Sequence, residues 1–391
     1  MYIYTNTIFN QLLNFLPKDK LQQIIGQHAS DKWVKSLTTW NQLVVLLYAQ
    51  ATGKDSLREI ETGFSLHGGT WHHLGIRTVA RSTLSYANNR RDYHIFEELF
   101  YALLERCRTI TPTHVFSFTN PLYSLDATTI KLCLSLFDWA MYTKQKGALK
   151  LHTLLNVRTT IPELLVSSDG KTGDITAGKG MNLPERLKNG SIIVFDRAYI
   201  DYGWWKELND SSIFFVSRTK SNQHIAFLGQ HEAPQELGII ADERVLIGEH
   251  YGYEKYPDVL RRVRYYDKET KIVYDYLTNN FELSAGTIAG IYKQRWQIEL
   301  FFKWIKQNLK IKTFLGISQN AVLTQIWIAM IYYLLLAYIK FQTKFSRPLL
   351  MLTRMVKETL LARRPLIDLL SLTPRTLDRF DPRAGPQMAF W

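Results

Sequence analysis

The sequence predicts a multidomain α/β protein with an all-helical N-terminal unit and a mixed core that carries a β-rich insertion. Its length of 391 residues suggests two or three units. Residues 1–112 show apolar residues at helical spacing and few strand signals. From residue 113 onward, β-rich runs alternate with short helical segments. Two of these strand patterns carry an aspartate at a distinctive point, Asp126 and Asp196.

The N-terminal unit contains "FNQLLNFL", "KDKLQQIIGQH" and "WNQLVVLLYAQ", each with the spacing of a packed helix. Later, "KDSLREIETGF" and "ARSTLSYANNRRDYHIFEELFYALL" predict two helices joined by a loop with "HGGTWHHLG". This arrangement resembles a helix-turn-helix DNA reader. The candidate DNA contacts are Arg81, Ser82, Thr83, Ser85, Arg90 and Arg91. The alternative is a helical bundle whose arginines lie in solvent.

The core begins with three β-rich runs, 122–134, 148–159 and 161–170, which we expect to pair as antiparallel neighbours. A short helix over 182–190 follows, and then "SIIVFDRAY", whose continuous apolar run is typical of a strand buried on both faces. "YGWWKEL" predicts a helix and "SIFFVSRTK" another strand. The predicted order is therefore β-β-β-α-β-α-β over residues 113–220.

Residues 221–281 interrupt this order with hairpin patterns, which predicts an inserted β-rich subdomain. One of its strands carries Arg261, Arg262 and Arg264. The core resumes over 282–344, and residues 345–391 form a helical, basic tail. The apolar run 326–339 is shorter than the roughly 18 to 20 residues of a membrane span, so it predicts a buried helix and no membrane partner.

The helix near residue 299 lines up a specific set of polar side chains. At about 100° per residue, Tyr292, Arg295, Glu299 and Lys306 fall within an arc of roughly 60°. Ile298 and its apolar neighbours point elsewhere and anchor the helix in a core. A surface ion pair at helical spacing is the simpler explanation for Glu299 alone.

Asp126, Asp196 and Glu299 together suggest a metal site. The carboxyl ends of central strands form the usual crevice for chemistry in α/β sheets. Three converging carboxylates repel one another unless a cation joins them, and Mg²⁺ is the hard cation that few carboxylates, waters and phosphate oxygens hold. Two such ions suit an in-line phosphoryl displacement.

The overall charge favours a polyanionic partner. Lysine and arginine number 48 against 35 aspartate and glutamate, a net charge of +13, and nucleic acid is the commonest such partner. Cys107 and Cys133 lack metal-type spacing, which fits a reducing, cytoplasmic compartment. No signal-peptide pattern is evident at the N-terminus.

These features resemble a known family. An acid on the first strand, an acid after the fourth and a glutamate on a later helix resemble the DDE transposases with an RNase H-like catalytic domain. Tyr292, Arg295, Glu299 and Lys306 match the Y-x2-R-x3-E-x6-K signature of the bacterial insertion sequence four (IS-four) family. The β-rich insertion before Glu299 is also typical of that family.

The resemblance implies a DNA transposase that cleaves at the element ends and transfers the 3′-hydroxyl into target DNA. Asp126, Asp196 and Glu299 would hold two Mg²⁺ ions, with Mn²⁺ as a substitute. The partners implied are double-stranded DNA, as terminal inverted repeats and target, and a second copy of the chain in a homodimer. Residues implied to contact or to lie near the DNA are Tyr292, Arg295, Lys306, Trp296, Arg218 and Lys220, with Lys150 and His152 as further candidates. Arg197 is implied to be a cation that supports the three acids.

Two other functions remain open from the sequence alone. An RNase H-like nuclease or resolvase would use the same metals and stop at hydrolysis. A DNA-binding regulator derived from a decayed transposase would rely on the N-terminal helices and positive charge. The intact set of three acids argues against the regulator.

Overall fold

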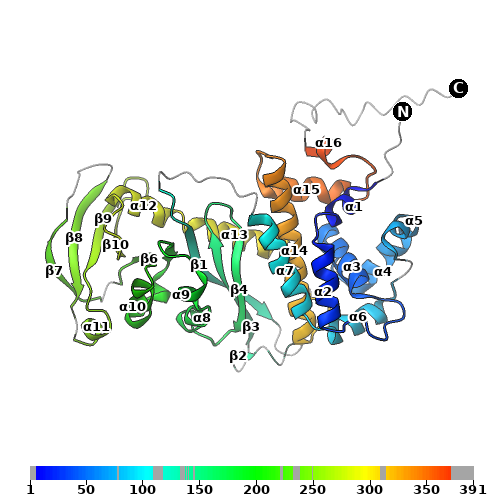
Figure 1. Cartoon of the computed structure of the whole chain (residues 1–391), viewed down its shortest axis with the longest axis horizontal. Coiled ribbons are helices and arrows are strands. Elements are labelled where there is room, and N and C mark those ends of the chain that lie inside the picture. Colours follow the sequence, from blue (N-terminus) through cyan, green and yellow to red (C-terminus); the bar gives the residue numbers. More distant parts are fainter. Residues whose placement is uncertain are drawn as a thin grey trace. The chain divides into compact units, whose positions relative to one another are not determined.

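The computed structural model describes residues 6–76, 79–108, 118–132, 137, 139, 141–143, 146–220, 223–231, 238–248, 250–308 and 314–370. Two compact units make up the chain. The helical unit comprises Met1–Thr111 and Asn308–Trp391, and the sheet unit comprises Pro112–Gln307 (Figure 1). Cys133 and the end of the predicted tail, residues 371–391, lie outside the described residues.

The described part of the helical unit is built from helices joined by turns and loops. Several begin at a side-chain cap, in which Ser56 accepts a hydrogen bond from the N–H of Glu59 and Ser318 one from the N–H of Ala321. The helices are α1 (Ile8–Leu13), α2 (Lys18–Gln27), α3 (Thr39–Thr52), α4 (Leu57–Leu66), α5 (Gly68–Trp71), the 3₁₀ helix η1 (His72–Leu74), α6 (Arg81–Arg90), α7 (His94–Arg108), α14 (Gln319–Gln342), α15 (Leu349–Thr359) and α16 (Leu366–Leu370).

Helix α14 is the core of this unit. Every side chain from Ala321 to Ile339 is buried, and the helix packs against α3, α6, α7 and α15. By length and composition it could cross a membrane, but its apolar stretch is wholly buried inside the protein, as expected for a helix that is apolar all round. The sequence-based limits assigned this segment to the core over 282–344, whereas the structure groups it with the N-terminal helices.

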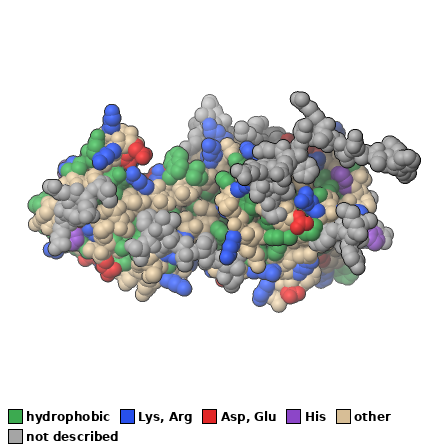
Figure 2. Space-filling view, turned by 90° about the horizontal axis from the view of Figure 1, so that it is seen from above, with side chains coloured by type: hydrophobic (Ala, Val, Ile, Leu, Met, Phe, Trp, Pro, Cys, Tyr) green, Lys and Arg blue, Asp and Glu red, His purple; other side chains and the backbone are tan. Residues whose placement is uncertain are grey.

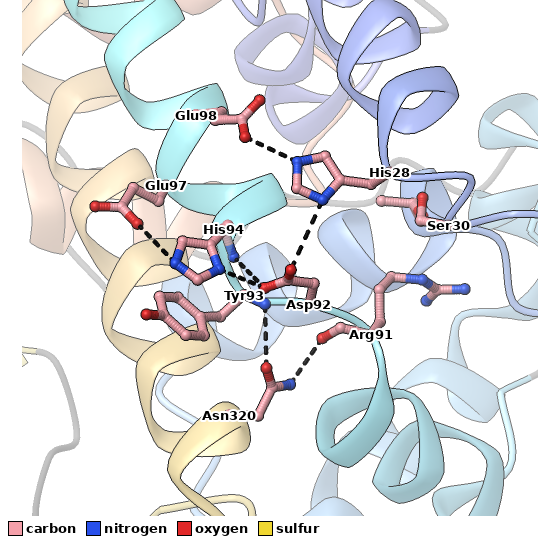
Figure 3. Close-up of polar contacts among 10 residues, drawn as sticks. His28, Ser30, Arg91, Asp92, Tyr93, His94, Glu97, Glu98 and Asn320 are labelled. Atoms are coloured by element: carbon pink, nitrogen blue, oxygen red, sulfur yellow. Dashed lines mark hydrogen bonds and ion pairs between the residues drawn. The ribbon is translucent and has the colours of Figure 1, made fainter.

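The long helix expected after residue 81 is divided into α6 and α7. Arg91 adopts an extended backbone (φ −76°, ψ 125°), and Asn320 of α14 stabilises the break. Its amide donates to the carbonyl oxygen of Arg91 and accepts from the N–H of Tyr93 (Figure 3). It also donates to the carbonyl oxygen of Asn88. A residue that lies 229 positions away from Arg91 therefore sets this helix boundary.

The described strands of the sheet unit form one mixed sheet, ordered β2-β3-β1-β5-β6-β10-β9-β8-β7, with β4 paired to β3. Strand β1 pairs antiparallel with β3 and parallel with β5, and β5 pairs parallel with β6. The strands are β1 (Leu122–Leu132), β2 (Met141–Thr143), β3 (Lys146–Asn156), β4 (Pro162–Asp169), β5 (Ile192–Phe195), β6 (Phe214–Arg218), β7 (Ile225–Gln230), β8 (Ile239–Ile247), β9 (Leu260–Asp267) and β10 (Ile272–Thr278).

The centre of the sheet is buried on both faces. All four residues of β5 are buried, as its apolar run predicted, and Phe195 and Phe215 pack with Trp204 and Trp205 on one side. The other face is covered by residues of α12 such as Ile288. The helices of this unit are α8 (Asp174–Gly180), α9 (Leu183–Arg186), η3 (Arg197–Tyr199), α10 (Tyr202–Asp210), α11 (His250–Lys255), α12 (Ala285–Lys293) and α13 (Trp296–Asn308).

The predicted insertion continues the same sheet, because β10 pairs antiparallel with β6. The arginines of β9 are engaged within it. Arg261 is buried and donates to both oxygens of buried Asp242 at 2.8 and 2.6 Å. Arg262 pairs with Glu243 and Arg264 with Asp275. These arginines therefore hold β8, β9 and β10 together.

Replacing Arg261 with alanine should destabilise the sheet unit by about 3–5 kcal/mol, because Asp242 would keep a buried charge without its partner. Chemical denaturation followed by circular dichroism measures this loss. Arg262→Ala is the matched control on the same strand, and its partly exposed pair should contribute about 1 kcal/mol or less. Equal losses for the two variants would contradict the role given to the buried pair.

Candidate active site

Asp126 lies near both of the other predicted acids, Asp196 and Glu299, at the centre of the sheet unit. Asp126 lies within β1, and Asp196 directly follows β5. The parallel register pairs Leu125 with Phe195, so the two aspartates occupy adjacent positions on neighbouring strands. Glu299 lies in the first turn of α13. The side chains of Asp126 and Glu299 approach the same guanidinium, that of Arg295.

The pKa of Asp126 reflects its burial and the nearby charges. Burial, together with the nearby charges of Asp196 and Glu299, raises the pKa of Asp126 to about 6, although the N–H of Ala127 and the charge of Arg295 oppose the shift. Asp126 Oδ1 accepts from that N–H at 2.7 Å. Asp196 Oδ1 accepts from the N–H of Ala198 at 2.8 Å and thereby caps η3. Asp196 and Glu299 are therefore close enough to Asp126 to disfavour its charged form.

Arg295 bridges the acids. Its Nη1 lies 3.3 Å from Asp126 Oδ2, and its Nη2 donates to Glu299 Oε1 at 2.5 Å. Its third donor, Nε–H, is buried and has no hydrogen-bond partner in the described part of the protein. A buried donor without an acceptor is costly, and an anionic oxygen from outside the chain would satisfy it.

The helix predicted to carry Arg295 and Glu299 is not continuous. Helix α12 ends at Lys293 and α13 begins at Trp296, and Gln294 and Arg295 form the turn between them. The N–H of Arg295 bonds to the carbonyl of Tyr292 at 3.0 Å. Because this bond spans three residues, the turn is tighter than an α-helix. The calculated arc assumed an uninterrupted helix, so it does not describe how Tyr292 lies relative to α13.

An aromatic and basic wall lies beside Arg295. The ring of Tyr292 packs on Tyr276 with a centroid separation of 4.7 Å, and the Arg295 guanidinium lies 6.0 Å from the Tyr292 ring. Burial raises the pKa of Tyr292, so its phenol stays neutral. Arg218, at the end of β6, lies over the ring of Tyr274 at 4.7 Å. Its positive charge lowers the pKa of Tyr292 and so opposes the effect of burial. Arg218, Tyr292 and Arg295 therefore form one group.

The other residues predicted to contact DNA do not join this group. Lys306, Trp296 and Lys220 have exposed side chains, as does Arg197. Arg81 and Arg90 are exposed on α6 of the helical unit. The Arg91 side chain is only 7% exposed and bonds to Gln42 Oε1 at 2.6 Å and to the carbonyl of Leu37 at 2.8 Å, so its guanidinium serves the helical unit itself.

Tyr199 lies beside two of the acids, whereas Lys150 and His152 make other contacts. Tyr199, which the sequence reasoning did not select, is buried near Asp126 and Asp196, and burial raises the pKa of its phenol. Its position three residues after Asp196 in "FDRAY" was the available signal. Lys150 pairs with Asp174 at 3.1 Å. His152 bonds to Ser168 at 2.8 Å, and burial lowers the pKa of its imidazole to about 4.

The donor set suits a hard divalent cation, although Arg295 now neutralises part of it. Within the described part of the chain, no three His, Cys, Asp or Glu side chains stand close enough to hold one ion. Asp126, whose pKa is raised by the nearby Asp196 and Glu299, belongs with them to the carboxylate oxygen ligands that Mg²⁺ prefers. Figure 2 shows Lys and Arg side chains spread over the visible face, with Asp and Glu at fewer places, which matches a polyanionic partner.

Comparisons with known proteins agree with this chemistry. The model of the family described as "Transposase DDE domain" matches residues 118–335, and that of a domain of unknown function, DUF4372, matches residues 4–77. A Sinorhizobium fredii protein named as transposase y4zB is 32% identical over 78% of this chain and 85% of its own length.

Two other relatives are named as transposases of insertion sequence elements. That of element IS5377 from Geobacillus stearothermophilus is 29% identical over 69% of this chain and 70% of its own. That of IS4SA from Synechocystis sp. is 27% identical over 66% and 71%. A solved structure of piggyBac transposase in a synaptic complex with hairpin DNA gives a TM-score of 0.45 at 10% identity, over 99% of this chain and 85% of that one.

Proposed function

This chain belongs to the transposases that carry a DDE domain, and from that premise we propose that Asp126, Asp196 and Glu299 are its three catalytic acids. As an insertion sequence transposase, it cleaves DNA and transfers strands. The observation that carries the assignment is the position of Asp126, which interacts electrostatically with Asp196 and Glu299 and shares the Arg295 guanidinium with Glu299. They come from two adjacent strands and one helix of the matched region.

The family depends on divalent metal ions, and we assign Mg²⁺, with Mn²⁺ as a substitute, to these carboxylates. Two ions, when bound, would activate the attacking oxygen and stabilise the leaving oxygen of a phosphodiester. Asp126 and Asp196 supply ligands from the rigid centre of the sheet. Glu299 supplies one from α13, whose first turn is also tied to Arg295.

Arg295 has two successive roles in this proposal. Without DNA it neutralises Asp126 and Glu299. With DNA it turns its guanidinium group toward a phosphate near the cleaved end. The unpaired Nε–H is an available donor for that phosphate. Arg218 and the neutral phenol of Tyr292 extend this phosphate contact. Lys306, Lys220 and Trp296 lie on exposed positions that suit further contacts with the DNA end.

Our assignment to the IS-four family within these transposases rests on the four signature residues. Tyr292, Arg295, Glu299 and Lys306 support an IS-four transposase with an RNase H-like core. The parallel β1-β5-β6 centre, joined to antiparallel β3, supports that core.

The predicted domain limits at 112, 220 and 281 remain part of the proposal, whereas the limit at 344 gives way to a core that ends near Gln307. The helical unit binds DNA through α6, with Arg81 and Arg90 as contacts, and two copies of the chain hold the two element ends.

The test is incubation of the full chain with DNA that carries the flanking inverted repeats, in Mg²⁺ or Mn²⁺. Electrophoresis should reveal both end cleavage and products in which the 3′-hydroxyl is joined to target DNA. Cleavage without joining would assign the site to a hydrolytic nuclease. End binding without either reaction would assign the chain to regulation.

A further inference from the structure

A hollow of about 530 Å³ lies in the helical unit, outside the acid cluster. Its wall comes from the segment 28–37, between α2 and α3, and from the last turns of α6 with the start of α7. The volume falls within the range of roughly 300–1,000 Å³ that is usual for small-molecule sites. Its lining belongs entirely to one unit, so it does not depend on how the two units are arranged.

Two aromatic side chains at this hollow are unusually open. Trp33 is 89% exposed and Tyr86 is 67% exposed. Trp33 also has a φ of +65°, a left-handed conformation that is strained for a bulky side chain. The exposed Trp33 ring therefore offers a flat apolar face on which a planar ligand can stack.

Cations accompany both rings. Lys32 Nζ lies 5.8 Å from the centre of the Trp33 ring, and the Arg90 guanidinium lies 6.0 Å from that of Tyr86. Lys35 adds a third exposed cation to the lining. Among the described residues, none of these three cations forms an ion pair.

The acids near the hollow are already engaged. Asp92 bonds to His94 Nδ1 at 2.7 Å and faces His28, whose other nitrogen bonds to Glu98 (Figure 3). Asp31 lies 3.5 Å from the Arg91 guanidinium. Burial lowers the pKa of Arg91 and Asp31 opposes that shift. Four cations, Lys32, Lys35, Arg90 and Arg91, line the hollow beside one acid, Asp92, so its net charge is positive, which suits phosphate.

We propose that this hollow binds an unpaired nucleotide of single-stranded DNA, with its base against both Trp33 and Tyr86 and its phosphates beside Lys32, Lys35 and Arg90. Aromatic rings interleaved with cations are the means by which proteins hold single strands. Inside a duplex a paired base has both faces covered by its neighbours, so an exposed ring finds a stacking face on every unpaired base but only at the ends of a duplex. The inference rests on the proposed function, because it refines how the helical unit binds DNA.

The experiment measures the affinity of the full chain for a mixed-sequence single-stranded oligonucleotide and for the same sequence as a blunt duplex, at low salt without metal. Trp33→Ala and Tyr86→Ala should each weaken single-strand binding by about tenfold, with less than a twofold change for the duplex. Trp33→Phe should restore most of the binding, because it keeps a stacking face. Single-strand binding should quench tryptophan fluorescence in the native chain and much less in Trp33→Phe.

Phe227→Ala is the matched control, since Phe227 is an exposed ring, 57% open, on β7 of the sheet unit. Unchanged single-strand affinity in both alanine variants would overturn the proposal. An equal loss for duplex would assign the surface to duplex docking. A change of oligomeric state in sedimentation would assign it to a second copy. Strand transfer by the native chain is measured in parallel, so failure of the hollow and failure of the proposed function give different results.

Discussion

Replacing Glu299 with glutamine should reduce end cleavage and strand transfer by at least about 100-fold, because even residues that only support a metal ligand typically contribute 10- to 100-fold. The amide keeps the shape of the side chain and an oxygen that can accept from Arg295 Nη2. It loses the negative charge that a divalent ion requires. Gel assays in Mg²⁺ and in Mn²⁺ measure both reactions.

Glu207→Gln provides the matched control for that change. Glu207 is an exposed carboxylate on α10 of the same unit, and its loss should leave both reactions unchanged. Mobility shift with end DNA should show that the Glu299 variant still binds. Undiminished metal-dependent cleavage by Glu299→Gln would reject the three-acid mechanism outright.

The centre of the sheet could be predicted because its signals are local. The apolar run before Asp196 is long enough to require burial on both faces, and β5 lies where that run predicted it. The hairpin patterns of residues 221–281 also correspond to observed strands. The pairing of β10 with β6 was not predictable, since strand neighbours are chosen by contacts between distant parts of the chain.

Helix boundaries were harder to predict because side chains from elsewhere set them. Asn320 ends α6 by bonding to the carbonyls of Asn88 and Arg91, and no local breaker marks that site. The turn at Gln294–Arg295 likewise contains neither glycine nor proline. The grouping of α14 with the helical unit depends on its packing against α3 and α7, which its apolar composition alone does not specify.

The sequence could predict which residues form the candidate site, but it could not predict which of them pair with one another. Residue types and spacing selected Asp126, Asp196, Glu299 and Arg295, whose roles remain a proposal. Helical spacing suggested an ion pair of Glu299 with Lys303 or Lys306, whereas Glu299 pairs with Arg295. Spacing could not indicate that the same guanidinium reaches Asp126, 169 residues earlier in the chain.

Arg295→Ala should strengthen metal binding and weaken strand transfer. In the DNA-free protein, Arg295 competes with a cation for Asp126 and Glu299. Removing this partly buried positive charge should raise the affinity for Mn²⁺ severalfold, because an adjacent unit charge at such sites typically contributes about 1 kcal/mol or more. Calorimetric titration of the DNA-free chain with Mn²⁺ measures this change.

The same variant should lose strand transfer by about tenfold or more, since a charge-assisted bond to phosphate contributes roughly 1.5–3 kcal/mol. Arg295→Lys should recover only part of it, because lysine keeps the charge and lacks the planar fork. Lys303→Ala removes an exposed cation from the same helix and should change Mn²⁺ affinity little. A collapse of Mn²⁺ affinity in Arg295→Ala would mean that Arg295 holds the acids in place for the metal, and normal strand transfer would mean that it does not contact the DNA.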